Sequence, residues 1–395
     1  MTTRKQRQIE VKGLFYITHK DNVASILRHG VLSHASVLDK GLSYRAIYDA
    51  DIVSNRKDKV TPSGNSLWKY ANVYFQARNP MMYRVVHEKG VNDLAVIGFN
   101  SSVLDTPGVF IADGNAANSA TRFYNVKDGL GALTEIWSII TGEWWNSTDG
   151  SKRKIMAECL IPDGIPPEHI HTVYVANQRV ADEIRAAIGS PRIPIVPEPD
   201  LFFLPARRYR ITPNLFLAEG DMFFSNMQTI TVSVNLVGVM GKGLASRTKY
   251  QFPDVYVTYQ DACRRKALRM GWPYLYKRES SFDDELVDEP GLISSPNGIK
   301  WFLLFATKRH WRENSDLPGI IEGLAWVTKN ALKEGIKSLA MPALGCGLGN
   351  LEWKDVGPVM CQHLSKLDIP ISIYLPRERE IPNEYLSPEY LLGQV

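Results

Sequence analysis

The chain has 395 residues, and its 44% hydrophobic and 22% charged content excludes a disordered protein and predicts two globular domains. No stretch approaches the roughly 18 apolar residues of a membrane span, and no apolar run follows the basic N-terminus. The four cysteines form no Cys-x-x-Cys pair. We therefore expect a cytoplasmic protein without membrane or metal sites. The excess positive charge, +4 overall, lies in residues 1–210, which carry 26 Lys+Arg against 21 Asp+Glu and favour either a polyanionic partner or a solvated basic surface.

Three strand-like segments are spread along the N-terminal half. Residues 13–19 are aromatic and β-branched, residues 72–77 have the same character, and residues 155–161 form a third apolar run. After the first of them, residues 22–29 show helical spacing and stop at Gly30.

The third segment contains one carboxylate, Glu158, in an otherwise apolar run. A buried glutamate costs several kcal/mol unless it is paired or used, which favours a catalytic role. A strand also alternates its faces, so the same residue could simply point to water. The pattern leaves both interpretations open.

The loop before this segment, residues 142–154, combines aromatic and basic side chains: Trp144, Trp145, Lys152, Arg153 and Lys154. Aromatic planes beside cations are what single-stranded DNA binding requires. The alternative is a pair of core tryptophans next to a solvated basic turn.

Three motifs in order resemble the DarT family: Tyr16-Ile-Thr-His19 with Asn22, Tyr74 to Tyr83, and Ala157-Glu-Cys-Leu160. The resemblance covers residues 12–205 and implies an ADP-ribosyltransferase fold, a split β core with helices. It also implies transfer of ADP-ribose from NAD to a base in single-stranded DNA, with thymidine and guanosine both open as the target.

The resemblance assigns roles residue by residue. Glu158 would steady the ribose hydroxyl and take the proton from the attacking nitrogen, and Arg56 would be the catalytic arginine. Arg122 is a candidate NAD contact or a plain surface arginine. The full set of NAD contacts is Tyr16, Thr18, His19, Asn22, Tyr74 and Arg122. The DNA contacts are Arg78, Met82, Trp144, Trp145, Lys152, Arg153 and Lys154.

Prolines concentrated in residues 189–213, with three arginines at 207–210, predict an extended connection. We therefore expect a first domain at 1–205, a linker at 206–213 and a second domain at 214–395. The acidic segment 279–290 is expected to be a surface loop of the second domain.

The second half alternates strand-like and helix-like segments. Residues 229–237, 301–305 and 338–344 read as buried strands, and residues 318–335 carry helical spacing. This pattern predicts an α/β domain with a mostly parallel or mixed sheet between helices.

Two glycine-rich loops directly follow two of these strands, at residues 237–243 and 342–349. Glycines let backbone N–H groups close on an anion, so two such loops predict a diphosphate site. Lys242 lacks the spacing of a nucleotide triphosphatase loop, so we do not expect ATP hydrolysis.

Both loops and the intervening Thr307-Lys-Arg-His-Trp-Arg312 resemble a macrodomain of the DarG antitoxin type, over residues 215–376. That resemblance implies removal of ADP-ribose from a DNA base, with Lys308 as the catalytic amine; pairing of Lys308 with phosphate alone is the alternative. Asp221 would accept the adenine amino group and Asn235 would contact the distal ribose. The full set of ADP-ribose contacts is Asp221, Met222, Asn235, Gly241, Gly243, Leu244, Thr307, Gly345, Cys346, Gly347, Leu348 and Gly349.

Together the two resemblances predict a toxin–antitoxin fusion that attaches ADP-ribose to single-stranded DNA and removes it again. NAD would be the donor substrate, no metal is expected, and contact between the two domains is left open. Two alternatives remain: a module that reads ADP-ribose without turnover, and a transferase that acts on RNA or protein.

Overall fold

The computed structural model describes residues 9–47, 56–189, 192–280, 286–288, 300–377 and 379–393, which form two compact units. The first comprises Met1–Phe202 with Asp284–Ile293, and the second comprises Phe203–Asp283 with Ser294–Val395. Among the helices of the described ranges, none has the length and apolarity needed to cross a membrane.

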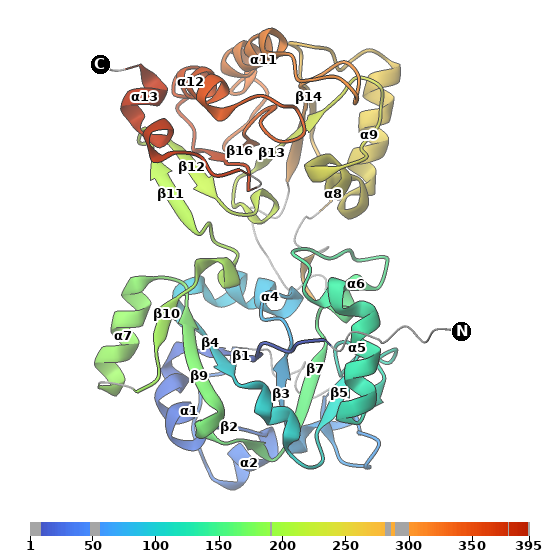
Figure 1. Ribbon diagram of the computed structural model, residues 1–395, viewed down its shortest axis with the longest axis vertical. Coiled ribbons are helices and arrows are strands. Elements are labelled where there is room, and N and C mark those ends of the chain that lie inside the picture. Colours follow the sequence, from blue (N-terminus) through green and yellow to red (C-terminus); the bar gives the residue numbers. More distant parts are fainter. Residues whose placement is uncertain are drawn as a thin grey trace. The chain divides into compact units, whose positions relative to one another are not determined.

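An eight-stranded sheet forms the centre of the first unit, in the order β10-β9-β4-β1-β3-β7-β5-β6 (Figure 1). Only β9 and β10 pair in parallel. The two short strands β2 and β8 pair separately. The strands are β1 Leu14–His19, β2 Val31–Leu32, β3 Tyr70–Tyr74, β4 Leu94–Phe99, β5 Phe110–Ala112, β6 Phe123–Tyr124, β7 Glu158–Pro162, β8 Gly164–Ile165, β9 Ile170–Val175 and β10 Ile195–Pro197.

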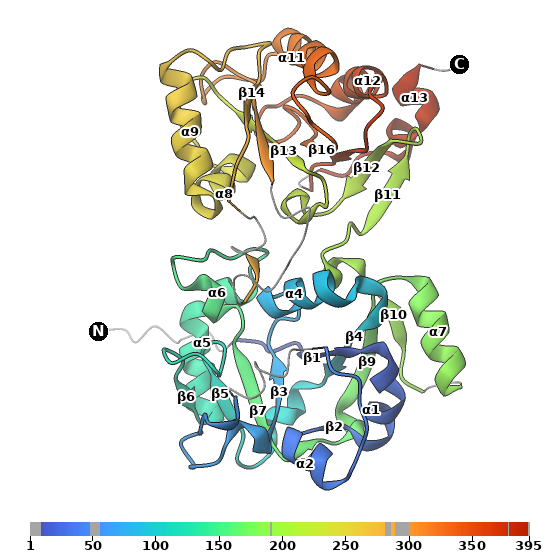
Figure 2. The same ribbon diagram turned by 180° about the vertical axis from the view of Figure 1, so that it is seen from behind.

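Helices flank this sheet, and local signals fix where they begin and end (Figure 2). Helix α4 starts where the Asn79 side chain accepts from the Met82 N–H and Pro80 fills the first turn. Helix α1 ends at Gly30, whose φ of +77° and close approach to the Ile165 carbonyl leave no room for a side chain. The helices are α1 Val23–His29, α2 His34–Asp39, α4 Pro80–Lys89, α5 Val126–Ile140, α6 Ser151–Lys154 and α7 Gln178–Ile188.

Strand register brings the N-terminal motifs together. Tyr74 of β3 lies opposite Phe15 of β1 on one side and opposite Glu158 of β7 on the other. Glu158 in turn lies opposite Ala112 of β5. Phe15 and Glu158, which are 143 residues apart in sequence (158 − 15), therefore lie on either side of Tyr74 at one end of the sheet.

The second unit is built on a seven-stranded sheet in the order β11-β12-β17-β16-β13-β15-β14. Its five central strands are parallel and its two edge strands are antiparallel, which confirms the expected mixed sheet. Its strands are β11 Arg207–Arg210, β12 Leu215–Glu219, β13 Thr229–Val234, β14 Tyr274–Tyr276, β15 Trp301–Ala306, β16 Leu339–Pro342 and β17 Ile371–Tyr374. Its helices are α8 Gly243–Gln251, α9 Pro253–Arg264, α11 Leu317–Asn330, α12 Trp353–Leu364 and α13 Pro388–Leu392.

Alternation along β15 shows that both faces of this sheet are covered. Leu303 and Phe305 belong to the core that includes α11 and α12. Phe302 points the other way and packs against Phe252, which lies between α8 and α9, with ring centroids 5.1 Å apart. A buried parallel sheet of this kind explains the unbroken apolar runs in the sequence.

Two expectations about the connections need correction. Arg207–Arg210 is not a linker, because it forms the edge strand β11 against β12, and the units divide between Phe202 and Phe203. Within the acidic segment 279–290, residues 281–285, 289 and 290 lie outside the described part. Leu286–Asp288 is no surface loop of the second unit: it packs in the first unit, with Leu286 and Val287 fully buried.

Candidate functional sites

Glu158 lies at the start of β7 and is completely buried. Arg56 Nη2 lies 2.8 Å from its Oε2, and the Ala116 N–H donates to its Oε1 at 2.9 Å. A charged partner and a backbone donor together offset the cost of burying the carboxylate. The interpretation of Glu158 as a solvent-facing strand residue is therefore wrong.

The neighbours of Glu158 are held in fixed protonation states. Burial lowers the pKa of Arg56, but attraction to Glu158 more than offsets this and the net effect raises it, so the guanidinium stays charged. Burial and then the Glu158 charge raise the pKa of Tyr74 far above its ordinary value, so its phenol stays neutral.

Arg56 and Tyr74 line a cavity of about 300 Å³ in the first unit. Tyr16, Thr18 and Asn22, three of the expected NAD contacts, line it too. Glu158 does not line the cavity itself but lies directly behind Arg56. Arg56 therefore separates this cavity from the carboxylate, and the binding of NAD in the cavity stays a prediction.

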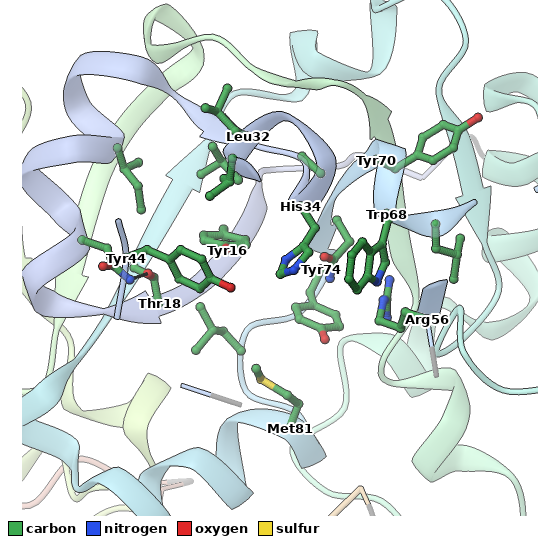
Figure 3. A pocket seen from close by; sticks show the side chains of 18 of the residues that line it. Tyr16, Thr18, Leu32, His34, Tyr44, Arg56, Trp68, Tyr70, Tyr74 and Met81 are labelled. Carbon is green, nitrogen blue, oxygen red and sulfur yellow. Dashed lines mark hydrogen bonds between the residues drawn. The ribbon is translucent and has the colours of Figure 1, made fainter. Parts of the chain in front are cut away.

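Aromatic side chains that sequence reasoning missed complete the wall. The rings of Tyr44, His34 and Trp68 follow one another across the cavity (Figure 3). The His34 and Trp68 ring centroids are 4.3 Å apart, and burial lowers the pKa of His34. Of these three residues, only Trp68 lies in a stretch of the sequence that is dense in aromatic residues, positions 68–75.

Asn22 connects two parts of this wall. Its Nδ2 donates to Thr18 Oγ1 at 3.1 Å and to the Arg45 carbonyl at 2.8 Å, and its Oδ1 accepts from the Arg45 N–H. His19 and Arg122 do not line the cavity. The His19 ring accepts from the Asp21 N–H, and Arg122 is exposed beyond β5, so their NAD contacts stay predictions.

Four of the seven expected DNA contacts are engaged by other residues of the first unit. Met82 is fully buried, and Arg78 is 6% exposed and donates to the carbonyls of Asp200 and Glu143. The other two are Trp145 and Arg153. The Trp145 side chain is 1% exposed, and its Nε1 donates to the Leu286 carbonyl. The Arg153 Nη1 donates to Asp113 Oδ1 and Thr121 Oγ1.

In this structure these four side chains stabilise buried carbonyls, loops and core contacts, and their contact with DNA stays a prediction. Trp144, Lys152 and Lys154 are partly exposed, so their contact with DNA stays a prediction.

In the second unit, the loop after β16 is shaped by its glycines. Gly345 has a φ of +76°, and a side chain there would collide with Leu351. A Cβ on Gly349 would lie 2.2 Å from Ser315 Oγ and 2.5 Å from the Gly345 carbonyl. The loop therefore folds back on itself with backbone in close contact, as a diphosphate cradle requires.

Asn235 organises the other glycine loop. Its Nδ2 donates to the Val239 carbonyl at 2.6 Å, and its Oδ1 accepts from the Val237 N–H at 3.0 Å and the Tyr259 hydroxyl at 2.9 Å. The structure thus assigns the Asn235 amide to holding the loop ahead of α8. Its contact with a ribose stays a prediction.

Asp221 is 4% exposed and pairs with Arg247 Nη1 at 2.7 Å. Arg247 also lies over the Phe223 ring, 4.3 Å from the centroid. Sequence reasoning missed Arg247, since nothing local links it to a carboxylate 26 residues earlier.

The remaining expected ADP-ribose contacts differ in exposure. Met222, Thr307 and Cys346 are buried, and burial raises the pKa of Cys346 to about 12, so its thiol stays protonated. Gly241, Gly243 and Gly347 are exposed, as is Leu348 at 66%, while Leu244 is half-buried. All of these ligand contacts stay predictions.

Lys308 lies just beyond the end of β15, against the second glycine loop. Its Nζ donates to the Leu348 carbonyl at 3.0 Å. Burial lowers its pKa, with Glu313 opposing the shift, so more of the amine is deprotonated near neutral pH than in a free lysine. An amine in this condition can act as a nucleophile or a base, and the catalytic role of Lys308 stays a prediction.

Comparison with known proteins finds relatives of both units. Residues 15–203 match the family model of DarT, described as an ssDNA thymidine ADP-ribosyltransferase. The chain is 53% identical over 380 residues to a DNA ADP-ribosyl transferase-DNA ADP-ribosyl glycohydrolase fusion protein of Thermosipho africanus, covering 96% of this chain and 98% of that one.

Solved structures and a shorter match extend the comparison. The structure of Thermosipho africanus DarTG in complex with ADP-ribose is 51% identical, with a TM-score of 0.91, over 96% of this chain and 100% of that one. A Mycobacterium tuberculosis DNA ADP-ribosyl glycohydrolase is 32% identical over 159 residues, 40% of this chain and 41% of that protein.

This chain and its fusion relatives share the same two domains, a transferase followed by a macrodomain. The chain belongs to the family of fusion proteins that join a DNA ADP-ribosyl transferase to a DNA ADP-ribosyl glycohydrolase. This confirms the DarT and DarG resemblances read from the sequence.

Proposed function

We propose that the first unit transfers ADP-ribose from NAD to a base of single-stranded DNA, and that the second unit removes it, as a toxin and its antitoxin in one chain. The observation that carries the proposal is the buried Glu158–Arg56 pair behind an aromatic-lined cavity of about 300 Å³. A cytoplasmic location is part of the proposal, because NAD and DNA are both present there.

The transfer step follows from this geometry. The bond between C1″ and nicotinamide breaks, and nicotinamide leaves with the electron pair. A nitrogen of the base then bonds to C1″, and the proton it loses passes to Glu158. Arg56 must move from the position that covers Glu158, and its fixed positive charge then suits contact with the NAD phosphates.

The acceptor base is thymidine or guanosine. Thymidine is favoured by the description of the family whose model matches residues 15–203. A mass spectrum of modified oligonucleotides that differ in a single base identifies which of the two carries the added ADP-ribose.

The removal step uses Lys308 and one water, and it yields ADP-ribose and the unmodified base. In one route the amine attacks C1″, the base leaves with the electron pair of the broken bond and gains a proton, and the ring-opened Schiff base is then hydrolysed. In the other route Lys308 forms a hydrogen bond to the departing base while water attacks C1″. Borohydride traps the first intermediate as a stable adduct on Lys308 and leaves the second route unlabelled.

Lysine variants test this assignment. Lys308→Ala should slow removal by at least a hundredfold and should leave labelling of oligonucleotides by NAD intact, so that its expression becomes toxic. Lys308→Arg keeps the positive charge but cannot deprotonate. If the arginine variant removes ADP-ribose at the parent rate, Lys308 only pairs with phosphate and its catalytic role is excluded.

The same assay tests the acceptor. Transfer of label from NAD into RNA or protein, but not into single-stranded DNA, would contradict the proposed substrate. Binding of ADP-ribose by the full chain without any turnover would contradict the enzymatic proposal as a whole.

A further inference from the structure

Three residues, Leu286–Asp288, pack in the first unit although they stand in the sequence between two strands of the second unit's sheet, β14 and β15. Leu286 and Val287 are fully buried, and the Asp288 side chain is 8% exposed. We call these three residues the inserted tripeptide. Two fully buried apolar side chains show that it is a packed part of the transferase unit.

Asp288 binds a guanidinium at the wall of the cavity. Arg84 of α4 donates through Nε to Asp288 Oδ1 at 2.7 Å and through Nη2 to Oδ2 at 3.4 Å. Both residues line the same cavity as Arg56 and Tyr74. The arginine fork binds a carboxylate and a phosphate in the same two-pronged way, so this position is an anion site.

At this anion site one positive charge, that of Arg84, faces two negative charges. Arg84 also donates to Glu88 Oε1 at 3.3 Å, one turn along the same helix. Glu88 therefore already supplies one negative charge, and Asp288 adds a second. A phosphate diester carries one negative charge, so it can replace Asp288 without changing the total.

The inserted tripeptide also covers an aromatic side chain. The Trp145 Nε1 donates to the Leu286 carbonyl at 2.9 Å, and the indole is 1% exposed. An arginine and a tryptophan are the pair of groups that grips the backbone and a base of single-stranded nucleic acid. Both are occupied here by one short piece of the chain.

We propose that Arg84 forms a phosphate-binding site of the transferase and that Asp288 is its built-in occupant, which a phosphate of the DNA acceptor displaces. The inference rests on the proposed transferase function. The tripeptide holds the transferase in a low-activity state, and displacement of Asp288 also releases Leu286 from Trp145. The chemistry of the site is that of a phosphate group, which either the DNA backbone or the NAD diphosphate could supply.

The experiment uses the full chain with Lys308→Ala, so that removal does not mask transfer. Asp288→Asn is added, and the KM for a single-stranded oligonucleotide and the KM for NAD are measured separately. We expect the oligonucleotide KM to fall about tenfold with the NAD KM unchanged. A fall in the NAD KM alone would overturn the DNA assignment in favour of the NAD diphosphate.

Glu88→Gln is the matched control, because it removes a negative charge from the same arginine and leaves the tripeptide in place. Its oligonucleotide KM should stay within about twofold of the parent. If both variants shift the KM equally, the effect is one of charge and the proposal of a displaceable occupant is wrong. Loss of labelling in a folded Asp288→Asn variant would show that the tripeptide is structural, which also overturns it.

A second measurement needs no turnover. The affinity of the same variants for unmodified oligonucleotide, followed by fluorescence anisotropy, should rise about tenfold for Asp288→Asn. A parent that binds the oligonucleotide but never labels it would contradict the proposed function and leave this binding result standing. Equal affinity in parent and variant would contradict the inference, whatever the activity.

Discussion

The two candidate catalytic centres of this chain control a charged group in opposite ways. Glu158 lies on a strand, is fully buried and has its charge balanced by Arg56 at 2.8 Å. Lys308 lies in a loop, is partly exposed, and donates to a backbone carbonyl. The first centre is built from side chains on a sheet, and the second from backbone that glycines allow to approach closely.

This difference predicts that the two centres lose activity in response to different kinds of substitution. A strand centre should lose function when one side chain changes its charge, because partner groups are already fixed around it. A loop centre should depend on the space around its backbone and on the protonation of its lysine. The following predictions test each half of that statement.

The largest effect is expected at Glu158. Glu158→Gln keeps the shape but removes the charge that holds Arg56 and the base that takes the proton, so transfer should fall by about 10²–10⁴-fold. The measurement is incorporation of labelled ADP-ribose from NAD into an oligonucleotide. Removal of ADP-ribose from modified DNA by the same variant is the control and should not change.

The loop of the second unit should respond to a single methyl group. Gly349→Ala places Cβ within 2.5 Å of Ser315 Oγ and the Gly345 carbonyl, so the loop must shift. Overpacking of this kind costs about 1–3 kcal/mol of folding free energy. We expect the affinity for ADP-ribose to fall roughly tenfold, which corresponds to about 1.4 kcal/mol.

The control for this loop is two residues away. Gly347→Ala meets no atom within 4 Å, and neither glycine has the positive φ that would strain alanine. Isothermal titration with ADP-ribose compares the two variants. Equal losses of affinity would contradict the role of close backbone packing.

The smallest effect is a change in pH dependence. Burial lowers the pKa of Lys308 below its ordinary 10.5, so its free amine increases as pH rises through that lowered value. The kcat/KM for removal should rise with pH, at most tenfold per pH unit, and level off below pH 10.5. Glu313 raises this pKa, so Glu313→Gln should move the midpoint to lower pH.

Single-turnover hydrolysis of a modified oligonucleotide between pH 5 and about 11.5 gives this profile. The Lys308→Arg variant should show no such rise. A midpoint at or above 10.5 in the parent would exclude the buried, deprotonated amine as the reactive form.

The part of the site that local motifs encode could be predicted. Glu158 within an apolar run, Lys308 next to a strand end and the glycines at 345–349 carry their signals in a few neighbouring residues, so the sequence alone was enough to propose them. Strand periodicity likewise predicted the mixed sheet of the second unit, because a buried parallel strand must be apolar along its whole length.

Pairing between distant segments could not be predicted. Arg207–Arg210 resembles a linker in composition, and it becomes a strand only because β12 offers an edge with matching hydrogen bonds. Trp145 and Arg153 have the composition of a DNA-binding loop, but Leu286 and Asp113 engage them.

The sequence by itself therefore determined both enzyme families and the two fold classes, and it singled out the candidate carboxylate and amine, since each depends on local patterns of a few residues. Only the tertiary structure decided that Glu158 is buried behind Arg56, that Asn235 holds a loop, and that Leu286–Asp288 packs in the first unit. The physical reason is that burial and ion pairing depend on which distant segments meet, and composition does not encode those meetings.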